Sequence, residues 1–321
     1  MKGKRIILSI LLAWIILSAF NIQALAEEEK PIIVCTTNVL GSIVEEILEG
    51  KADVVVLARP GICPADYDMK PGDIYAVSKA KLLFYHGIMG EHWLDKLVSA
   101  AGNKELIMVK IPGPWNTPTG AKQYIQWIGG NLSKYLGIDL TGKVEAMTAA
   151  IDEAAEEIKN EAEALKVEDV KVICMKWQIP FVKWVGFNVV AEYGPPEMLP
   201  AGLVANLTKT AETEGVALII DNLQVGVDFG EALASDVGAY HVVLTNFPGA
   251  IPGTENLAEM FKYNARQLFD GVKIWRMVQS NREKVRSLED QVSLYQIIAV
   301  IAILIAVVEA VFVYSWKKPR D

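Results

Sequence analysis

Short apolar runs alternate with amphipathic segments along most of the chain, and this alternation restricts the fold more than any other feature of the sequence. From residue 31, the runs PIIVCTT, DVVVLA, KLLFYHG and ELIMVKI are each followed by a loop or a segment with helical spacing of its apolar residues. Such alternation is typical of βα units, in which helices cover parallel strands. The series predicts a four-stranded N-terminal α/β lobe over residues 31–138.

Residues 141–166 interrupt this alternation. Apolar residues recur at steps of three and four from Val144 to Leu165, and no turn residue follows Gly142. This spacing predicts one helix of about 25 residues. A second alternating series follows, with the runs VKVICM, FVKWVGF, NVVAEYG, VALIIDN and YHVVLTNF. It predicts a C-terminal α/β lobe over residues 167–271, joined to the first lobe by the long helix.

The two ends of the chain predict export and attachment to a membrane. A basic start, an apolar run over residues 6–20 and the small residues ALA at 24–26 are typical of a signal peptide, expected to comprise residues 1–26. An uncleaved N-terminal anchor is the alternative. Residues 296–316 are apolar and long enough to cross a hydrocarbon core of about 30 Å as a transmembrane helix. Basic residues follow, so the tail 317–321 is expected in the cytoplasm and the lobes on the extracytoplasmic face.

Between the second lobe and the apolar span, residues 274–295 are expected to form a helical stalk. Val278, Val285, Leu288 and Val292 are spaced at three, four and seven, which makes a short coiled coil one interpretation. Glu309 lies inside the apolar span, where it is expected either to reach water at the helix end or to face a partner helix.

Composition narrows the classes of partner. The formal net charge of −8, with no basic patch, argues against nucleic acid. Three cysteines are too few for a disulfide scaffold, although Cys35 and Cys63 follow neighbouring predicted strands and are a candidate pair outside the cell. No cysteine follows the N-terminal apolar run, which disfavours a lipid anchor. Sequons at Asn131 and Asn206 make the exported chain a glycoprotein candidate.

Four stretches resemble a known family. CTTNVLGSIVEEI, RPGICPADYDMKPGDIYAVSKAKLLFYHG, EHWLDKL and WNTPTGAK are similar, in order and spacing, to the metal-type (zinc or manganese) solute-binding proteins of ABC importers. The resemblance covers residues 31–271. It implies two α/β lobes with a ligand cleft between them, and a receptor that delivers a metal ion to an ABC permease subunit.

The resemblance also implies that the usual metal ligands have been replaced. The imidazoles of the family fall on Ala65, Gly113 and Met175, and its last two carboxylates fall on Asn222 and Thr245. Imidazole and carboxylate groups are the donors that suit zinc and manganese. The scaffold is therefore expected to be retained with a rewritten ligand site.

Eight residues are predicted to face the ligand, by their positions at strand ends and in the matched motifs. They are Cys63, Asp66, His86, Trp115, Met175, Trp177, Asn222 and Thr245. For each of them a structural role, in the core or as a helix cap, is the alternative. His92 and His241 begin a helix and a strand, and are expected to be solvent-exposed or capping residues.

Two classes of ligand stay open. Cys63, Cys174, Met175 and His86 would suit a soft metal ion, because thiolate and thioether groups select soft cations. An organic molecule or a metal chelate would instead pack on the tryptophans. No three donors have a reliable coordination spacing, which favours the second class.

The sequence thus predicts a membrane-anchored, extracytoplasmic solute-binding protein of an ABC importer. A surface protein that binds or adheres without transport, on the same scaffold, is the alternative. An enzyme is least favoured, because the chain has no G-x-S-x-G, no H-E-x-x-H and no phosphate-binding glycine loop.

Overall fold

The computed structural model describes residues 30–317 of the 321-residue chain. The expected signal peptide and residues 318–321 of the expected tail lie outside the described residues. The chain divides into two compact units. The first contains the residues up to Trp115, Thr119–Ala149 and Phe247–Ala250; the second contains Asn116–Pro118, Ala150–Asn246 and the residues from Ile251 onward.

The first unit is built on a four-stranded parallel sheet with the strand order β2-β1-β3-β4. Val34, in the middle of β1, pairs with Val55 on one side and with Leu83 on the other. Residues 33–37 of β1 are buried, because helices cover both faces of the sheet, and a strand covered on both faces is apolar throughout rather than alternating. The strands are β1 (Ile32–Thr37), β2 (Asp53–Ala58), β3 (Leu82–Tyr85) and β4 (Ile107–Lys110).

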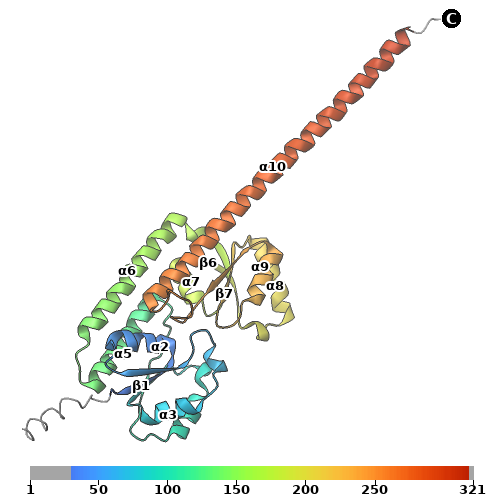
Figure 1. Ribbon diagram of the computed structural model, residues 1–321. Coiled ribbons are helices and arrows are strands. Elements are labelled where there is room, and N and C mark those ends of the chain that lie inside the picture. Colours follow the sequence, from blue (N-terminus) through green and yellow to red (C-terminus); the bar gives the residue numbers. More distant parts are fainter. Residues whose placement is uncertain (1–29, 318–321) are drawn as a thin grey trace, which may run out of the picture. The chain divides into compact units, whose positions relative to one another are not determined.

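Helices and two short 3₁₀ turns connect these strands (Figure 1). On one face of the sheet, Val77 and Leu97 pack in a buried cluster with Val34 and Leu83. The helical elements are α2 (Asn38–Leu48), η1 (Pro64–Asp66), α3 (Pro71–Lys79), η2 (Met89–Glu91), α4 (Leu94–Ala101) and α5 (Pro118–Leu136).

The second unit repeats the same plan. Its parallel sheet has the strand order β6-β5-β7-β8, so the edge and central positions are filled in the same sequence as in the first sheet. The strands are β5 (Lys171–Met175), β6 (Asn188–Tyr193), β7 (Leu218–Asn222) and β8 (Tyr240–Leu244). The expected α/β fold with two parallel sheets is confirmed.

The helices of the second unit differ from the sequence pattern at one place. The apolar run FVKWVGF lies largely in a short helix, α7 (Ile179–Val185), because Pro180 stands in its first turn and Gly186, with φ of 125°, ends it. In Figure 1, α9 lies beside β7 and α8 lies beside α9. The remaining elements are η3 (Val167–Asp169), η4 (Pro196–Met198), α8 (Ala201–Glu214) and α9 (Asp228–Val237).

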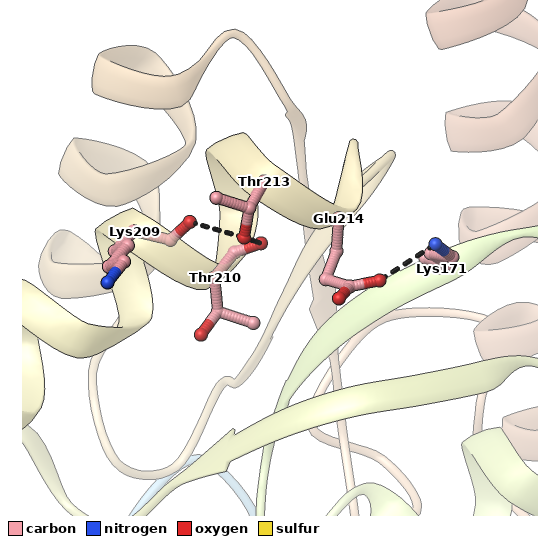
Figure 2. Close-up of polar contacts among 5 residues, drawn as sticks. All are labelled: Lys171, Lys209, Thr210, Thr213 and Glu214. Carbon is pink, nitrogen blue, oxygen red and sulfur yellow. Dashed lines mark hydrogen bonds and ion pairs between the residues drawn. The ribbon is translucent and has the colours of Figure 1, made fainter.

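Polar contacts at the end of α8 fasten it to the start of β5 (Figure 2). Lys171 Nζ lies 2.8 Å from Glu214 Oε2, and the Thr213 hydroxyl donates to the Lys209 carbonyl at 2.9 Å. Both charged side chains are exposed, so this ion pair contributes at most about 1 kcal/mol to stability.

The helix α6 (Thr141–Leu165) has the 25 residues that the apolar spacing predicts. Its residues up to Ala149 belong to the first unit and the rest to the second. Ile151 and Ile158 are buried on its inner face. Ion pairs from Lys262 to Glu157, at 2.9 Å, and from Lys273 to Glu161, at 2.8 Å, link α10 to the part of α6 in the second unit.

The helix α10 (Leu257–Lys317) is a single uninterrupted helix of 61 residues. Its first turns pack on the second sheet, and Gly271 allows the close approach, because a Cβ there would lie 2.9 Å from Val242 Cγ2. The last helix of the lobe, the stalk and the apolar span expected from the sequence therefore form one element (Figure 1).

Candidate functional site

All eight residues that the sequence predicts to face a ligand lie at or beyond the carboxyl ends of parallel strands. In open α/β sheets, ligands bind beyond this edge. Cys63 and Asp66 follow β2, His86 follows β3, and Trp115 follows β4 in the first unit. Met175 ends β5 and Trp177 follows it, Asn222 ends β7, and Thr245 follows β8 in the second unit.

A buried carboxylate organises the edge of the first sheet. Glu91 is 6% exposed, and it accepts hydrogen bonds from the backbone N–H groups of His86, Gly87 and Ile88 and from the Thr36 hydroxyl. These four donors surround the charge and compensate its removal from water. Glu91 therefore fixes the loop after β3, and with it the position of His86.

Both ring nitrogens of His86 have partners. Nε2 lies 2.6 Å from the Thr37 hydroxyl oxygen, and Nδ1 lies 3.1 Å from the Tyr124 hydroxyl oxygen. Tyr124 in turn donates toward the carbonyls of Ile111 and Gly113, each at 2.8 Å. Burial lowers the pKa of His86 to about 3, so the imidazole is neutral at pH 7. The ring is positioned by this network rather than left open to a metal ion.

Aromatic rings extend from His86 along the same edge. The His86 and Trp115 ring centroids are 4.4 Å apart, and Trp115 contacts Phe247 at 5.8 Å. Trp115 is half-buried and lies beside Gly113, which is exposed. An aromatic surface of this kind suits a flat or apolar solute better than a bare cation.

Contacts with Trp93 fix the loop that follows β2. The Trp93 indole N–H donates to the Pro64 carbonyl at 2.8 Å, and the Tyr67 ring packs on Trp93 with centroids 4.1 Å apart. The Tyr67 hydroxyl also donates to Asp73, and burial together with that carboxylate raises the pKa of Tyr67. Cys63 is half-buried, whereas Ala65 and Asp66 are exposed at the tip of the loop.

In the second unit, amide side chains dominate the strand ends. Asn116 and Asn246 both donate to the Trp177 carbonyl, at 2.7 and 3.1 Å, while 39% of Trp177 is exposed. Asn222 and Thr245 are buried. The Asn222 side chain accepts from the Gln224 backbone at 3.0 Å, and the Gln224 side chain donates to Thr245 Oγ1 at 2.9 Å.

Gln178 is the least satisfied polar group of this edge. Its side chain is fully buried, and neither its amide nitrogen nor its amide oxygen has a hydrogen-bond partner within residues 30–317. Buried amides are nearly always paired, so such a group calls for an explanation. A solute or a water molecule that takes up these bonds would supply one.

The second unit also contains a cluster that the sequence does not predict. Asp221 is buried, and it accepts from the Tyr193 hydroxyl and pairs with His241 Nε2 at 2.8 Å. Burial and the adjacent carboxylate raise the pKa of Tyr193. The expectation that His241 is a solvent-exposed or capping residue is therefore wrong, because its ring is directed to a buried carboxylate.

The three cysteines are free thiols, so the candidate pair Cys35 and Cys63 does not form a disulfide. Cys35 lies inside β1, and burial raises its pKa. Cys174 is buried in β5, where its Sγ donates to the Met175 carbonyl at 3.3 Å, and burial raises its pKa. The Met175 sulfur, in turn, accepts from the Trp177 backbone at 3.3 Å. Cys174 and Met175 thus serve the local backbone and the core.

The chain matches a family model described as ZnuA, zinc-uptake complex component A, periplasmic, over residues 33–271. It is 28% identical over 229 residues to the metal ABC transporter substrate-binding lipoprotein SsaB of Streptococcus sanguinis, covering 59% of this chain and 72% of that protein. It is 32% identical over 112 residues to the metal ABC transporter substrate-binding lipoprotein ScbA of Streptococcus cristatus, covering 33% of this chain and 36% of that protein. The chain thus spans little more than a third of the length of this second relative.

Solved structures show the same fold. The manganese-bound periplasmic metal-binding protein of Candidatus Liberibacter asiaticus matches with a TM-score of 0.66 at 13% identity, covering 76% of this chain and all of that one (100%). The solute-binding protein FpvC of P. aeruginosa, in complex with Ni²⁺, matches with a TM-score of 0.63 at 14% identity, covering 76% of this chain and 97% of that one.

Proposed function

Because the chain belongs to the ZnuA family of metal-type solute-binding proteins of ABC transporters, we propose that it is a membrane-anchored, extracytoplasmic receptor of an ABC importer with a rewritten ligand site. The family match covers both sheets and the helix between them. Proteins of this family bind solutes and are not enzymes. An ABC permease subunit is the proposed partner.

One observation supports the proposal that the ligand site is rewritten. Within either unit, among residues 30–317, no three His, Cys, Asp or Glu side chains lie close enough together to hold a metal ion. Protein sites for zinc use three or four such ligands. The positions at which the family places imidazoles are Ala65, Gly113 and Met175, and none of these supplies a nitrogen or carboxylate donor.

The chemistry of the cysteines also disfavours a bare soft cation as the solute. A thiolate, not a thiol, is the ligand that soft metals take. The Cys174 thiol is fully buried with its pKa raised, so it stays protonated at neutral pH. His86, the imidazole of this set, already has a partner at each nitrogen.

The solute that fits best is a small organic molecule or a metal chelate. A chelate brings its own donor atoms, so the protein needs to supply only packing surfaces and a few hydrogen bonds. Trp115 and Trp177 supply the packing surfaces. The buried side-chain amide of Gln178 supplies a hydrogen-bond donor and an acceptor that have no partner among the described residues. In this proposal Asn222 and Thr245 position the loops, and Cys63 and Asp66 lie on the exposed rim.

The C-terminal part of α10 supports the membrane anchor. Within the described residues this is the one helix long and apolar enough to cross a membrane, with a mean hydropathy of 2.8 over its most apolar 18 residues, none of them buried. A membrane anchor keeps a receptor near its permease. This role would replace that of the lipid group of the relatives that are lipoproteins.

The test uses the full-length protein in lipid nanodiscs. Native mass spectrometry is expected to detect an organic molecule or chelate that co-purifies, and titration calorimetry with Zn²⁺, Mn²⁺ or Cu⁺ under reducing conditions is expected to give no saturable heat. Stoichiometric binding of any of these free ions would overturn the rewritten site.

Two tryptophans of nearly equal exposure provide a matched pair for this experiment. Trp177 is 39% exposed at a strand end, and Trp127 is 38% exposed on α5. Trp177→Ala is expected to reduce the co-purified molecule at least tenfold, because its packing surface is lost. Trp127→Ala is expected to leave it unchanged, and equal losses in the two variants would contradict the assignment of Trp177.

A further inference from the structure

Beyond the second unit, α10 carries large apolar side chains on an exposed helix. In the stalk, residues 274–295, Val285 is 54% exposed, Leu288 is 60% exposed and Val292 is 54% exposed. An isolated helix gains little from apolar side chains in water, because they stabilise a helix only when another surface covers them.

These residues follow a heptad repeat. With Val278 at position a, the other a positions are Val285 and Val292, and the d positions are Asn281, Leu288 and Tyr295. β-Branched residues at a combined with leucine at d favour two-stranded parallel coiled coils. A groove on this face of the helix is lined by Val278, Asn281, Arg282, Val285, Arg286 and Glu289, and three of these are core positions of the repeat.

The charges that flank this seam complement each other between identical chains. Lys284 occupies position g, and Glu289 occupies position e of the next heptad. In a parallel pair these two positions face each other across the interface, once on each side. Neither side chain takes part in an ion pair among the described residues, so both are available for such a contact.

The same seam continues into the apolar span. The next three core positions are Ala299, Ala302 and Ala306, and the position after them is Glu309. Small residues allow helices to approach closely in lipid, and carboxyl groups in a span usually face a partner helix. The part of the repeat within the stalk, from Val278 to Tyr295, contains fewer than three heptads, so this continuity adds the length that a stable pair needs.

We propose that two copies of this chain associate in parallel through the seam of α10 formed by Val278, Val285, Leu288, Val292 and the alanines of the span. The second copy is the occupant because Lys284 and Glu289 of one chain complement Glu289 and Lys284 of another, which is the self-complementarity that two-fold symmetry requires. The parallel orientation rests on the proposed membrane anchor. Each dimer then contains two solute-binding chains.

Cysteine cross-linking in native membranes tests the seam directly. Leu288→Cys, at a d position, is compared with Asp290→Cys, at position f on the opposite face. Both are made in full-length protein with Cys63→Ser, since Cys35 and Cys174 are buried. Mild oxidation is expected to convert most of the Leu288→Cys protein to a species of twice the mass of the unoxidised chain in the same membranes, and little of the control. Equal cross-linking at both positions, or a product of another mass, would overturn the proposal.

Charge exchange gives a second measurement that leaves the apolar seam intact. Lys284→Glu or Glu289→Lys alone places like charges opposite each other twice per pair, so the dimer in detergent is expected to dissociate at roughly three- to tenfold higher concentration. The double variant is expected to restore wild-type association. A monomeric wild-type mass by light scattering, or a double variant weaker than either single one, would overturn the dimer.

Alkaline carbonate extraction of the same membranes separates failure of this proposal from failure of the anchor. Release of the chain contradicts the proposed anchor and, with it, the parallel pair. A chain that stays in the membrane but does not cross-link overturns the pair alone.

Discussion

His86 illustrates how a single side chain can lie at a candidate site and yet serve the scaffold. Its neutral ring connects Thr37 to Tyr124 and packs against Trp115. The folded protein keeps this ring unprotonated down to about pH 3, whereas in the unfolded chain it takes up a proton near its ordinary pKa of 6.5. The unfolded state therefore binds more protons at acidic pH, and folding stability falls as the pH falls below 6.5.

We expect this loss to reach about 1.4 kcal/mol per pH unit between pH 6 and 4. His86→Asn removes the titrating group, so its free energy of unfolding, measured by urea denaturation, is expected to fall less steeply over this range. At pH 7.5 the same variant is expected to be about 2 kcal/mol less stable than wild type, because Thr37 and Tyr124 lose a partner. His92→Asn, at an exposed histidine, is the control, and a slope that His86→Asn leaves unchanged would contradict the burial of a neutral ring.

For Gln178 we expect the opposite effect. Replacing this side chain is expected to stabilise the protein when no solute is bound. Gln178→Leu replaces an unpaired buried amide by an apolar group, which is expected to raise the free energy of unfolding by about 1–3 kcal/mol. The same change is expected to weaken solute binding, because a donor and an acceptor are lost. Thermal unfolding and the amount of co-purified molecule measure the two effects. A less stable variant would show that the amide has a partner in the protein.

At the scale of elements, alanine substitutions at two neighbouring glycines of α5 distinguish the effect of helix packing on stability from the effect of helix propensity. A Cβ at Gly129 would lie 2.2 Å from Val144 Cγ2 of α6, whereas a Cβ at Gly130 would have nothing within 4 Å. Gly129→Ala is expected to push α5 from α6 and cost about 1–3 kcal/mol. Gly130→Ala is expected to add about 0.5–1 kcal/mol, because alanine is the better helix former. Equal effects in chemical denaturation would contradict the close contact between these helices.

The parts of the fold that follow from the sequence are the elements with a long or repeated apolar pattern. The spacing from Val144 to Leu165 specified α6, and the apolar runs specified the eight parallel strands. The seven-residue run FVKWVGF is too short for its period to distinguish helix from strand, and its helix depends on Pro180 and Gly186. The continuity between the last helix of the lobe and the stalk does not follow from the sequence, because a change in composition along a helix resembles a boundary.

The candidate site could be predicted only in part, for a related reason. Strand ends can be located from the apolar pattern, so the positions of His86, Trp115 and Trp177 followed from the sequence. Networks such as Thr36 with Glu91, or Tyr193 with Asp221 and His241, join residues 20 to 55 positions apart. No local pattern in one sequence specifies such contacts, because they arise only when the sheets form.

At the scale of the whole molecule, the two units share one strand order but differ in the chemistry of their strand ends. The first offers an aromatic surface around Trp115, and the second offers amides around Trp177. Among the described residues of each unit, no three His, Cys, Asp or Glu side chains lie close enough together to hold a metal ion. In the proposed function the scaffold retains its architecture while its recognition chemistry differs, since the sheets are stabilised by apolar packing and not by the ligand.

The unbroken course of α10 has a mechanical consequence. A lipid tether on a flexible linker fixes neither the height of a receptor above the membrane nor its orientation. If α10 anchors the chain as proposed, residues 274–295, as a continuous helix rising 1.5 Å per residue, set the second unit roughly 33 Å above the bilayer and leave it no swivel point along that length. In the proposed arrangement the receptor therefore meets its permease at a constant elevation, and the encounter becomes a search in two dimensions.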